Sequence, residues 1–434
     1  MGSLSEDISV MVIGAGSGGR LIAQGLKKAG IKCTVFERDP DLDSRPRDWN
    51  FGVYWAQTSL DECLPKEIKE KIISAQVDKF LPSPDAFIPF FNGITGELMT
   101  KIDSPYYLRL RRREFARVMG TGIDVRYNKK LVSIDATSGP GVTASFADGT
   151  QHTATLLVGA EGAHSPTREY LLGPEKGKLA YSDIVMATSL IKLPVDKVRE
   201  LQALHERITC ALHPNGNFLW FASQFPVVLP PLPAHDAVSS ADPAEWTFLF
   251  LMSWRQSGPL TYTSSADIMR DLKARCEEFG DVFRSITRAV PDDAPAWANY
   301  LPYWPSQPWH DHPAHGKVTL AGDAVHPMTP HRGEGLNNAI LDCAQLVQQI
   351  AAMPTHTAAA LADAVRRYEV EVVRRGNEVV RANLQNSLDV HDWSRIMESM
   401  IFRYSVARSV TGGKGEGEGE AQVKGGEGVG ESVE

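Results

Sequence analysis

The sequence predicts an α/β fold: a parallel sheet with crossover helices, an inserted and mostly antiparallel sheet, and helices at the C-terminal end. Three observations predict it. Residues 8–37 have the pattern of strand, glycine-rich turn, helix and strand. Residues 181–309 carry short β-like segments with aromatic residues and turn signals. Residues 317–347 return to a strand, a loop and a helix. We therefore expect three folded parts: a first domain from 1–180 completed by 310–350, an inserted substrate-binding domain at 181–309, and C-terminal helices at 351–410.

The first unit predicts a Rossmann-like dinucleotide-binding domain. A buried strand at 8–13 leads into three glycines at the spacing Gly14-x-Gly16-x-x-Gly19. Gly14 permits the tight turn, Gly16 lets a pyrophosphate approach the backbone, and Gly19 lets helix and strand pack closely. Glu37 ends the second strand and can accept hydrogen bonds from ribose hydroxyls. The alternative is a glycine-rich turn in an unrelated α/β domain.

Two further stretches of the first domain are ambiguous. The polar and aromatic loop at 45–52 either lines a cofactor or covers the sheet edge. A helix is expected to begin near Arg112, whose cationic side chain could meet the phosphates or ribityl chain of a dinucleotide. The alternative for Arg112 is a solvated surface charge. Residues 60–77 look helical, and residues 80–103 suggest a hairpin.

A second strand-to-helix turn runs from Gly159 to Arg168. Ser165 as N-cap before Pro166 at the first helical position explains those two residues. It leaves Glu161 and Arg168 without a role.

The inserted segment is expected to form a sheet with aromatic faces, which is a candidate substrate wall. Trp220, Phe221 and Trp246 could contact substrate there or be ordinary core residues. A proline-rich connector is expected at 226–243.

The third unit is a β-prone stretch at 317–321, then Gly322-Asp323, then a loop rich in proline and glycine that feeds a helix. A loop that enters a helix N-terminus offers free backbone N–H groups and a positive dipole end, which suit an anion. A plain tight turn would explain Gly322-Asp323 alone but not the whole run. His326 could be a structural histidine bonded to the backbone or a proton relay, and we favour the first. His331 lies nearer the glycine-rich loop and is a weak catalytic candidate.

Composition narrows the class of protein. The 434 residues carry a formal net charge of −8 and no basic stripe, which argues against nucleic acid as a partner. Five scattered cysteines without a Cys-x-x-Cys indicate buried thiols rather than disulfides or zinc. No apolar run reaches membrane-spanning length and no signal-peptide core is present, so a cytoplasmic protein is expected. Residues 411–434, rich in Gly, Glu and Lys, should be a disordered tail.

The three motifs together resemble the single-component FAD-dependent aromatic hydroxylases (class A flavoprotein monooxygenases), and in particular their fungal secondary-metabolite branch. The resemblance implies that three glycines hold the FAD pyrophosphate and Glu37 the adenosine ribose. It implies cofactor contacts for Arg112 and Asp323. Glu161 stands where the family usually has aspartate, which keeps the charge but moves it. The glycines implied to hold the pyrophosphate are Gly14, Gly16 and Gly19. The residues implied to lie along the flavin ring are Pro330, Gly333, Gly335, Leu336 and Asn337.

The resemblance also implies an activity. NAD(P)H would reduce the flavin, and O2 would form a C4a-hydroperoxide that hydroxylates or epoxidises an electron-rich aromatic, polyene or polyketide-type molecule, as in secondary-metabolite biosynthesis. Negative charge on the reduced flavin would lie at the backbone N–H groups near Leu336 and Asn337. This chemistry needs no metal and no protein nucleophile. The alternative function is an FAD-dependent dehydrogenase or oxidase that inserts no oxygen. The sequence predicts no particular oligomer.

Overall fold

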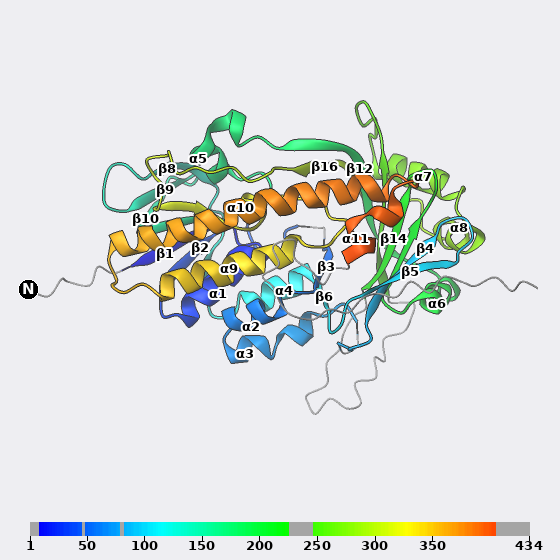
Figure 1. Ribbon diagram of the computed structural model, residues 1–434, viewed down its shortest axis with the longest axis horizontal. Coiled ribbons are helices and arrows are strands. Elements are labelled where there is room, and N and C mark those ends of the chain that lie inside the picture. The colour runs from blue at the N-terminus through cyan, green and yellow to red at the C-terminus, as the bar shows by residue number, and fades with distance from the viewer. Residues whose placement is uncertain (1–7, 46–47, 79–81, 225–245, 405–434) are drawn as a thin grey trace, which may run out of the picture.

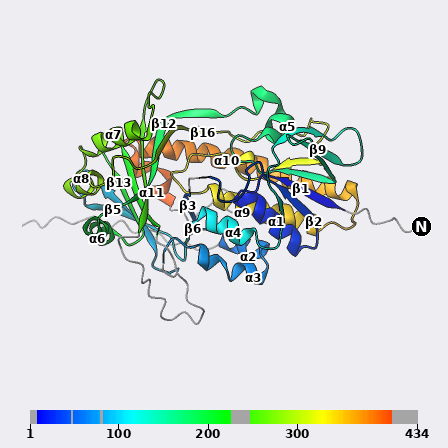
Figure 2. The same ribbon diagram turned by 180° about the vertical axis from the view of Figure 1, so that it is seen from behind.

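The computed structural model describes residues 8–45, 48–78, 82–224 and 246–404. Two sheets lie at opposite ends of an elongated molecule, and a long helix runs along both of them (Figures 1 and 2). The connector expected at 226–243, the tail expected at 411–434, and residues 46–47 of the ambiguous loop lie outside the described residues.

The first sheet is parallel, in the order β17-β11-β1-β2-β7. Its central strands are almost wholly apolar and buried, as expected for a sheet covered on both faces. Neighbouring strands end in register, since Ile13 pairs with Gly159 and Gly159 pairs with Leu320. The three motifs follow these three strand ends, so they meet at one edge of the sheet. The strands are β1 (Ser9–Ile13), β2 (Lys32–Phe36), β7 (Asp124–Arg126), β11 (Leu156–Gly159) and β17 (Val318–Leu320).

The second sheet has seven strands in the order β16-β12-β15-β14-β13-β4-β5 and is antiparallel except between β13 and β4. It confirms the predicted mostly antiparallel sheet. The hairpin expected at 80–103 is also present, and it extends this second sheet although it precedes residue 181. The strands are β4 (Phe87–Asn92), β5 (Leu98–Asp103), β12 (Ala180–Lys192), β13 (Ile208–Leu212), β14 (Phe218–Gln224), β15 (Thr247–Arg255) and β16 (Ala296–Tyr303).

A two-stranded ribbon of β3 (Asn50–Val53) and β6 (Leu108–Arg111) lies between the two sheets in both views. The sequence predicted only an irregular loop through 52, because a four-residue strand that pairs with a distant partner has little local signal. A small antiparallel sheet of β8 (Leu131–Asp135), β9 (Val142–Phe146) and β10 (Gln151–Ala154) completes the strands of the described chain.

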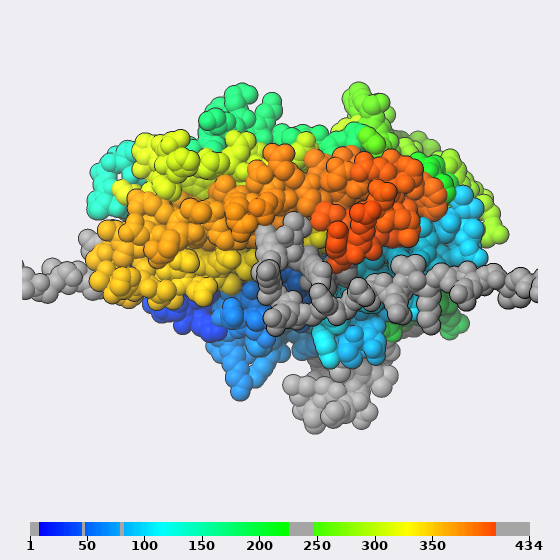
Figure 3. Space-filling model, in the orientation of Figure 1, coloured from blue at the N-terminus to red at the C-terminus, as the bar shows by residue number. Residues whose placement is uncertain are grey.

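The C-terminal helices join the two ends of the molecule. Helix α10 (Ala358–Val390) is one continuous helix, capped by Thr357, whose side chain accepts from the Ala360 N–H. Its Leu361 packs in the core beside the parallel sheet and its Val390 in a core under the second sheet, and it forms much of the face seen in Figure 3. The remaining helices are α1 (Ser17–Lys28), α2 (Gln57–Cys63), α3 (Lys66–Lys69), α4 (Arg112–Met119), α5 (Pro166–Lys176), α6 (Val195–Leu204), α7 (Ser265–Cys276), α8 (Asp281–Arg288), α9 (Gly335–Ala351) and α11 (Met400–Tyr404).

The structure confirms one predicted helix start and corrects the extent of one predicted helix. Helix α4 begins at Arg112, as predicted. The helix expected at 60–77 is broken into α2, α3 and a 3₁₀ turn at Ile72–Ala75, because Leu64 precedes a proline and takes an extended backbone. Within the described ranges, no helix has both the length and the apolar character that a membrane span requires. The five cysteines are free thiols.

Candidate functional site

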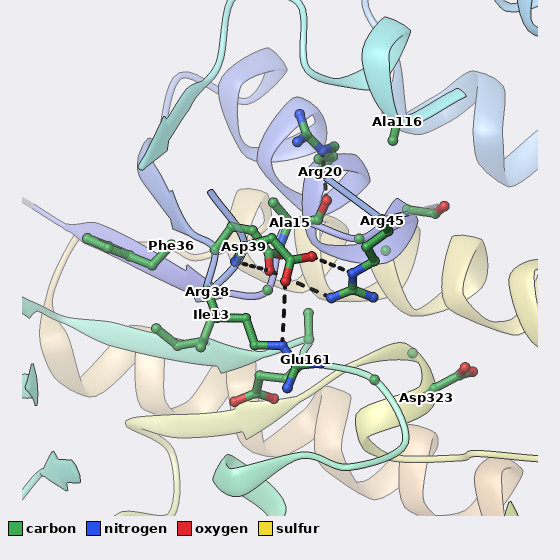
Figure 4. A pocket seen from close by; sticks show the side chains of 18 of the residues that line it. Ile13, Ala15, Arg20, Phe36, Arg38, Asp39, Arg45, Ala116, Glu161 and Asp323 are labelled. Atoms are coloured by element: carbon green, nitrogen blue, oxygen red, sulfur yellow. Dashed lines mark hydrogen bonds and ion pairs between the residues drawn. The ribbon is translucent and has the colours of Figure 1, made fainter. Parts of the chain in front are cut away.

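The loops after β1, β11 and β17 enclose a cavity of about 610 Å³ (Figure 4). Gly16 from the first loop, Glu161 from the second and Asp323 from the third all line it. These loops are far apart in the sequence, and the strand register described above brings them to the same edge. Carboxyl ends of parallel strands are where ligands bind in open α/β sheets. The other predicted residues that line this cavity are Gly14, Glu37, Arg112, Gly335 and Leu336.

The three glycines of the first motif have different surroundings. Gly14 has φ +101°, and a Cβ there would lie 2.5 Å from the Ala160 carbonyl oxygen. A Cβ on Gly19 would lie 2.0 Å from the Gly14 oxygen. Both positions therefore require glycine for the protein's own packing. A Cβ on Gly16 would meet no protein atom within 4 Å, so the space beside Gly16 is left open to the cavity.

Two helix N-termini open onto this cavity. Helix α1 follows Gly16 and helix α9 follows Glu334, and neither has a side-chain cap or an acidic residue in its first turn. Ser17 and Leu336 of these first turns line the cavity. Free N–H groups and the positive ends of two dipoles therefore face the same space, which favours a ligand that carries negative charge at two places.

Glu37 already has partners in the glycine loop. Its carboxylate accepts the Ala15 N–H at 2.7 Å and the Asp39 N–H at 3.1 Å, and Arg45 Nη2 lies 3.9 Å away. Figure 4 shows Arg45 reaching toward this acidic end of the cavity. The carboxylate is thereby held in a fixed orientation, with its charge only partly balanced by Arg45.

The second motif is a hydrogen-bonded unit. Ser165 caps α5, as predicted, because its Oγ accepts the Arg168 N–H at 3.0 Å. The same hydroxyl donates to Glu161 at 2.7 Å, and Thr167 donates to the other Glu161 oxygen. Burial raises the pKa of Glu161, although these hydrogen bonds oppose the shift.

Arg168 connects the second motif to the third. Its buried guanidinium donates to the carbonyls of Gly177 at 2.8 Å, Ala324 at 3.1 Å, and Ala163. Ala324 follows Asp323, so Arg168 fixes the turn that carries Asp323. The Asp323 side chain is accessible from the cavity but deeply set in the protein, and this burial raises its pKa. The contacts of Glu161 and Arg168 account for the two residues that helix capping alone left without a role.

Four residues predicted to contact the cofactor do not line the cavity: Gly19, Pro330, Gly333 and Asn337. Asn337 ties the start of α9 to β3, since its amide donates to the Gly52 carbonyl at 3.0 Å and accepts the Tyr54 N–H at 2.8 Å. Gly333 has φ +66°, and a Cβ there would lie 2.9 Å from the Tyr54 ring. The loop before α9 therefore packs against the ribbon between the two sheets.

The two histidines of the third motif are buried. His326 Nε2 lies 2.7 Å from Asp342 Oδ2, which is a bond to a side chain and not to the backbone. His331 does not line the cavity: its Nε2 lies 3.0 Å from Ser253 Oγ and its Nδ1 lies 2.7 Å from Ser387 Oγ. Burial, with the nearby His391, lowers the pKa of His331 well below its usual value.

Sequence reasoning missed a set of basic residues at the cavity rim. They come from the segment after β2, from the first turn of α4 and from the segment after β7, and only the tertiary fold brings them together. The one local signal was the run of arginines at 111–113. The missed residues are Arg38, Arg113, Lys129 and Lys130; Arg45, which also lies there, belongs to the loop that the sequence offered as a cofactor wall.

The aromatic residues proposed for a substrate wall lie on opposite faces of the second sheet, because successive side chains of a strand point to opposite faces. Phe221 and Trp246 are buried in the outer core between the second sheet and helices α7 and α8. Trp220 packs on the other side, with residues that flank the ribbon and beside Arg109 of β6. Among these three side chains, only Trp220 faces the first domain.

A glycine cradle, two uncapped helix N-termini and an acidic residue at the end of the second strand suit an adenine dinucleotide. The fold and the cavity thus define a dinucleotide-binding protein. Comparison with known proteins agrees: the family described as "FAD binding domain" matches residues 113–383. The chain belongs to the FAD-dependent monooxygenases, enzymes that use FAD with NAD(P)H and O2.

Named relatives come from fungi. The chain is 45% identical to the FAD-dependent monooxygenase cctM of Talaromyces islandicus, over 91% of this chain and 95% of the relative. It is 33% identical to the FAD-dependent monooxygenase phnB of Penicillium herquei, over 92% and 95% of the two chains. The fold is similar to Klebsiella pneumoniae HpxO, solved with FAD and uric acid, with a TM-score of 0.69, 19% identity and coverage of 94% and 95%.

Proposed function

We propose that FAD binds along the cavity with its pyrophosphate at the N-terminus of α1 and its flavin end at the N-terminus of α9. The observation that carries this proposal is that both uncapped N-termini face one cavity. Gly16 leaves room for the pyrophosphate, Glu37 holds the adenosine ribose, and Arg112 and Asp323 contact the middle of the cofactor. Glu161 supports this middle region through Ser165. The residues proposed to hold the flavin end are Gly335 and Leu336, with Gly333 and Asn337 supporting them by fixing the start of α9 against the ribbon.

Each group acts by binding or orienting. When bound, FAD supplies hydride acceptance from NAD(P)H and the activation of O2. The N–H groups at the start of α9 stabilise negative charge at the flavin end. The ribbon and Trp220 cover this end from the side of the second sheet, which limits water at the reacting atoms. We assign no general base, because His331 lies off the cavity and is engaged by two serines.

The proposed reaction is hydroxylation or epoxidation of an electron-rich aromatic, polyene or polyketide-type small molecule in fungal secondary metabolism. The named relatives support a monooxygenase, and the aromatic side chains around the ribbon suit a planar apolar substrate. A cytosolic location is part of the proposal, supported by five free thiols.

The test uses the purified holoenzyme, NAD(P)H and ¹⁸O2 with a panel of hydroxylated aromatics and polyenes. We expect ligand-stimulated NAD(P)H oxidation and one labelled oxygen atom in the product. A dehydrogenase or oxidase would instead give a product that is oxidised but unlabelled, and that result would overturn the proposal.

A further inference from the structure

Arg109 differs from the other buried arginines of the described chain in its partners. The guanidinium of each of the others meets a carboxylate or a backbone carbonyl, whereas the Arg109 guanidinium donates to the amide oxygen of Asn50 and to the hydroxyl of Tyr54. Its Nε has no partner, and the residue is 4% exposed. The buried arginines that meet a carboxylate or carbonyl are Arg20, Arg168, Arg207, Arg332 and Arg375.

The groups around Arg109 do not neutralise it. Burial raises the pKa of the Tyr54 hydroxyl and of the Cys210 thiol, so both stay uncharged. Burial also raises the pKa of Tyr107 to about 12. The buried carboxylates nearby have other partners: Asp78 pairs with Arg207, and Asp48 accepts the Arg113 N–H. A buried cation without an anion is costly, so its retention indicates a role for an incoming negative group.

Arg109 lies between the proposed flavin end and the second sheet. It pairs across the ribbon with Gly52, whose carbonyl accepts from Asn337 at the start of α9. Its neighbour Leu110 packs in the first core, so Arg109 points the opposite way, where its Cζ lies 5.2 Å from the centroid of the Trp220 ring.

Aromatic surface surrounds this charge. Trp49, Trp55 and Trp220 are only partly buried and pack around the same core as Tyr54. The Trp220 indole Nε1 has no hydrogen-bond partner. The Trp55 indole Nε1 also has none. Flat apolar faces beside a cation and free N–H donors suit a planar aromatic ligand that carries an oxyanion.

We propose that Arg109 binds the phenolate oxygen of a hydroxyaromatic substrate, with Trp220 against the ring. This inference rests on the proposed function, because it concerns the substrate of the same reaction. A bound phenolate is a more electron-rich ring than the neutral phenol, and it supplies the charge that Arg109 lacks. Arg109 is therefore a substrate-binding residue and also favours the reactive ionisation state.

The test measures binding to the holoenzyme without turnover, from the change in flavin absorbance. The probes are 2-naphthoate and its neutral counterpart 2-naphthamide. We expect the wild type to prefer the anion. R109M should weaken 2-naphthoate binding about ten- to a hundredfold and change 2-naphthamide binding little, and R109K should keep part of the preference. R111M is the matched control, because Arg111 lies on the same strand and pairs with the partly exposed Glu114.

Equal binding of both probes by the wild type, an equal loss of both in R109M, or the same anion-specific loss in R111M would each overturn the inference. Should R109M fail to hold FAD, a second measurement on the wild type decides: bound 2-naphthol must ionise below its solution pKa, and an unchanged or raised value contradicts the inference. Anion preference without labelled oxygen in the product would reject the proposed function alone, and labelled oxygen without anion preference would reject only this inference.

Discussion

The backbone N–H of Gly322 donates a 2.7 Å hydrogen bond to Oδ2 of Asp342, which ties the turn that carries Asp323 to helix α9. The other Asp342 oxygen accepts from Arg375 of α10 at 2.6 Å, and both side chains are fully buried. His326 Nε2 lies 2.7 Å from Oδ2. One carboxylate thus positions the third motif relative to two helices.

Asp342→Asn should destabilise the protein and weaken FAD binding. Removing one member of a buried ion pair costs about 3–5 kcal/mol, and we expect the lower end because Glu371 still pairs with Arg375. Chemical unfolding of the apoprotein and FAD titration measure the two effects. Asp363→Asn is the control, since Asp363 forms an exposed ion pair with Arg366, and both residues lie on α10, the helix that carries Arg375. Equal stability of D342N and D363N would contradict the role given to Asp342.

The Asp342 carboxylate also predicts how the stability of the folded protein changes at acid pH. Burial alone would raise the Asp342 pKa, but His326 and Arg375 outweigh it and lower the pKa from 3.8 to about 2. A carboxylate with a lowered pKa in the folded state stabilises the protein above its unfolded pKa, and this contribution is lost as pH falls. Wild type should therefore lose stability between about pH 4 and pH 2 more steeply than D342N. Parallel unfolding curves across that range would show that the ion pair is not responsible.

Gly16→Ala tests the cofactor cradle with little effect on the fold. The added methyl group would meet no protein atom within 4 Å. A loss of FAD affinity must therefore come from a clash between this methyl group and the bound FAD. We expect an apoprotein of unchanged melting temperature and at least about a tenfold weaker affinity, equivalent to roughly 1.4 kcal/mol. Gly139→Ala is the control, because a Cβ at Gly139 also meets no atom within 4 Å but lies away from the cavity. Normal FAD affinity in G16A would remove the pyrophosphate from this position.

The sequence predicted the parts of the site that depend on local patterns. The Gly14–Glu37 unit, the Ser165 cap and the start of α4 at Arg112 each have a chemical signature within about 25 residues or fewer. Strand β3 and the setting of Arg109 could not be predicted, because they depend on pairing between residues some 60 positions apart. The rim cations were missed for the same reason: an isolated lysine or arginine has no local pattern that separates a cavity wall from a solvated surface.

Glu161→Gln should change how stability depends on pH. The pKa of Glu161 is raised above 4.5 by burial, so ionising it in the folded state costs free energy. The native protein binds the extra proton, and wild-type stability should fall as pH rises from about 4.5 through the raised pKa. E161Q cannot ionise, so its advantage over wild type should appear only above pH 4.5 and then level off. Urea unfolding of the apoprotein from pH 4 to 8 measures this, with Glu169→Gln on the exposed side of α5 as control. A difference that does not vary with pH would reject the buried-charge explanation.

His331→Asn should affect stability much more than catalysis. His391 Nδ1 lies 2.6 Å from the Ser387 carbonyl, which can only accept, so Nδ1 carries the proton and Nε2 accepts from Ser253. The Ser253 oxygen then accepts from His331 Nε2, and His331 Nδ1 lies 2.7 Å from Ser387 Oγ, whose hydroxyl donates to Thr329 Oγ1. The His391 tautomer is thus fixed, and burial lowers the pKa of both histidines, that of His391 to about 4, which keeps them neutral.

Removing His331 leaves two buried hydroxyl groups without their partner, at a cost of about 1–3 kcal/mol. A histidine with a lowered pKa stabilises the folded protein above its unfolded pKa of 6.5, and this contribution is lost as pH falls below that value. The stability gap between wild type and H331N should therefore narrow from pH 7 to pH 5, while the coupling of NAD(P)H use to product stays normal. Ser394→Ala is the control, because Ser394 lies on an exposed turn just after the C-terminal end of α10. A fall in coupling with unchanged stability would instead place His331 in the reaction, because the chain of histidines and serines would then be serving proton transfer rather than the attachment of the 329–334 loop to β15 and α10.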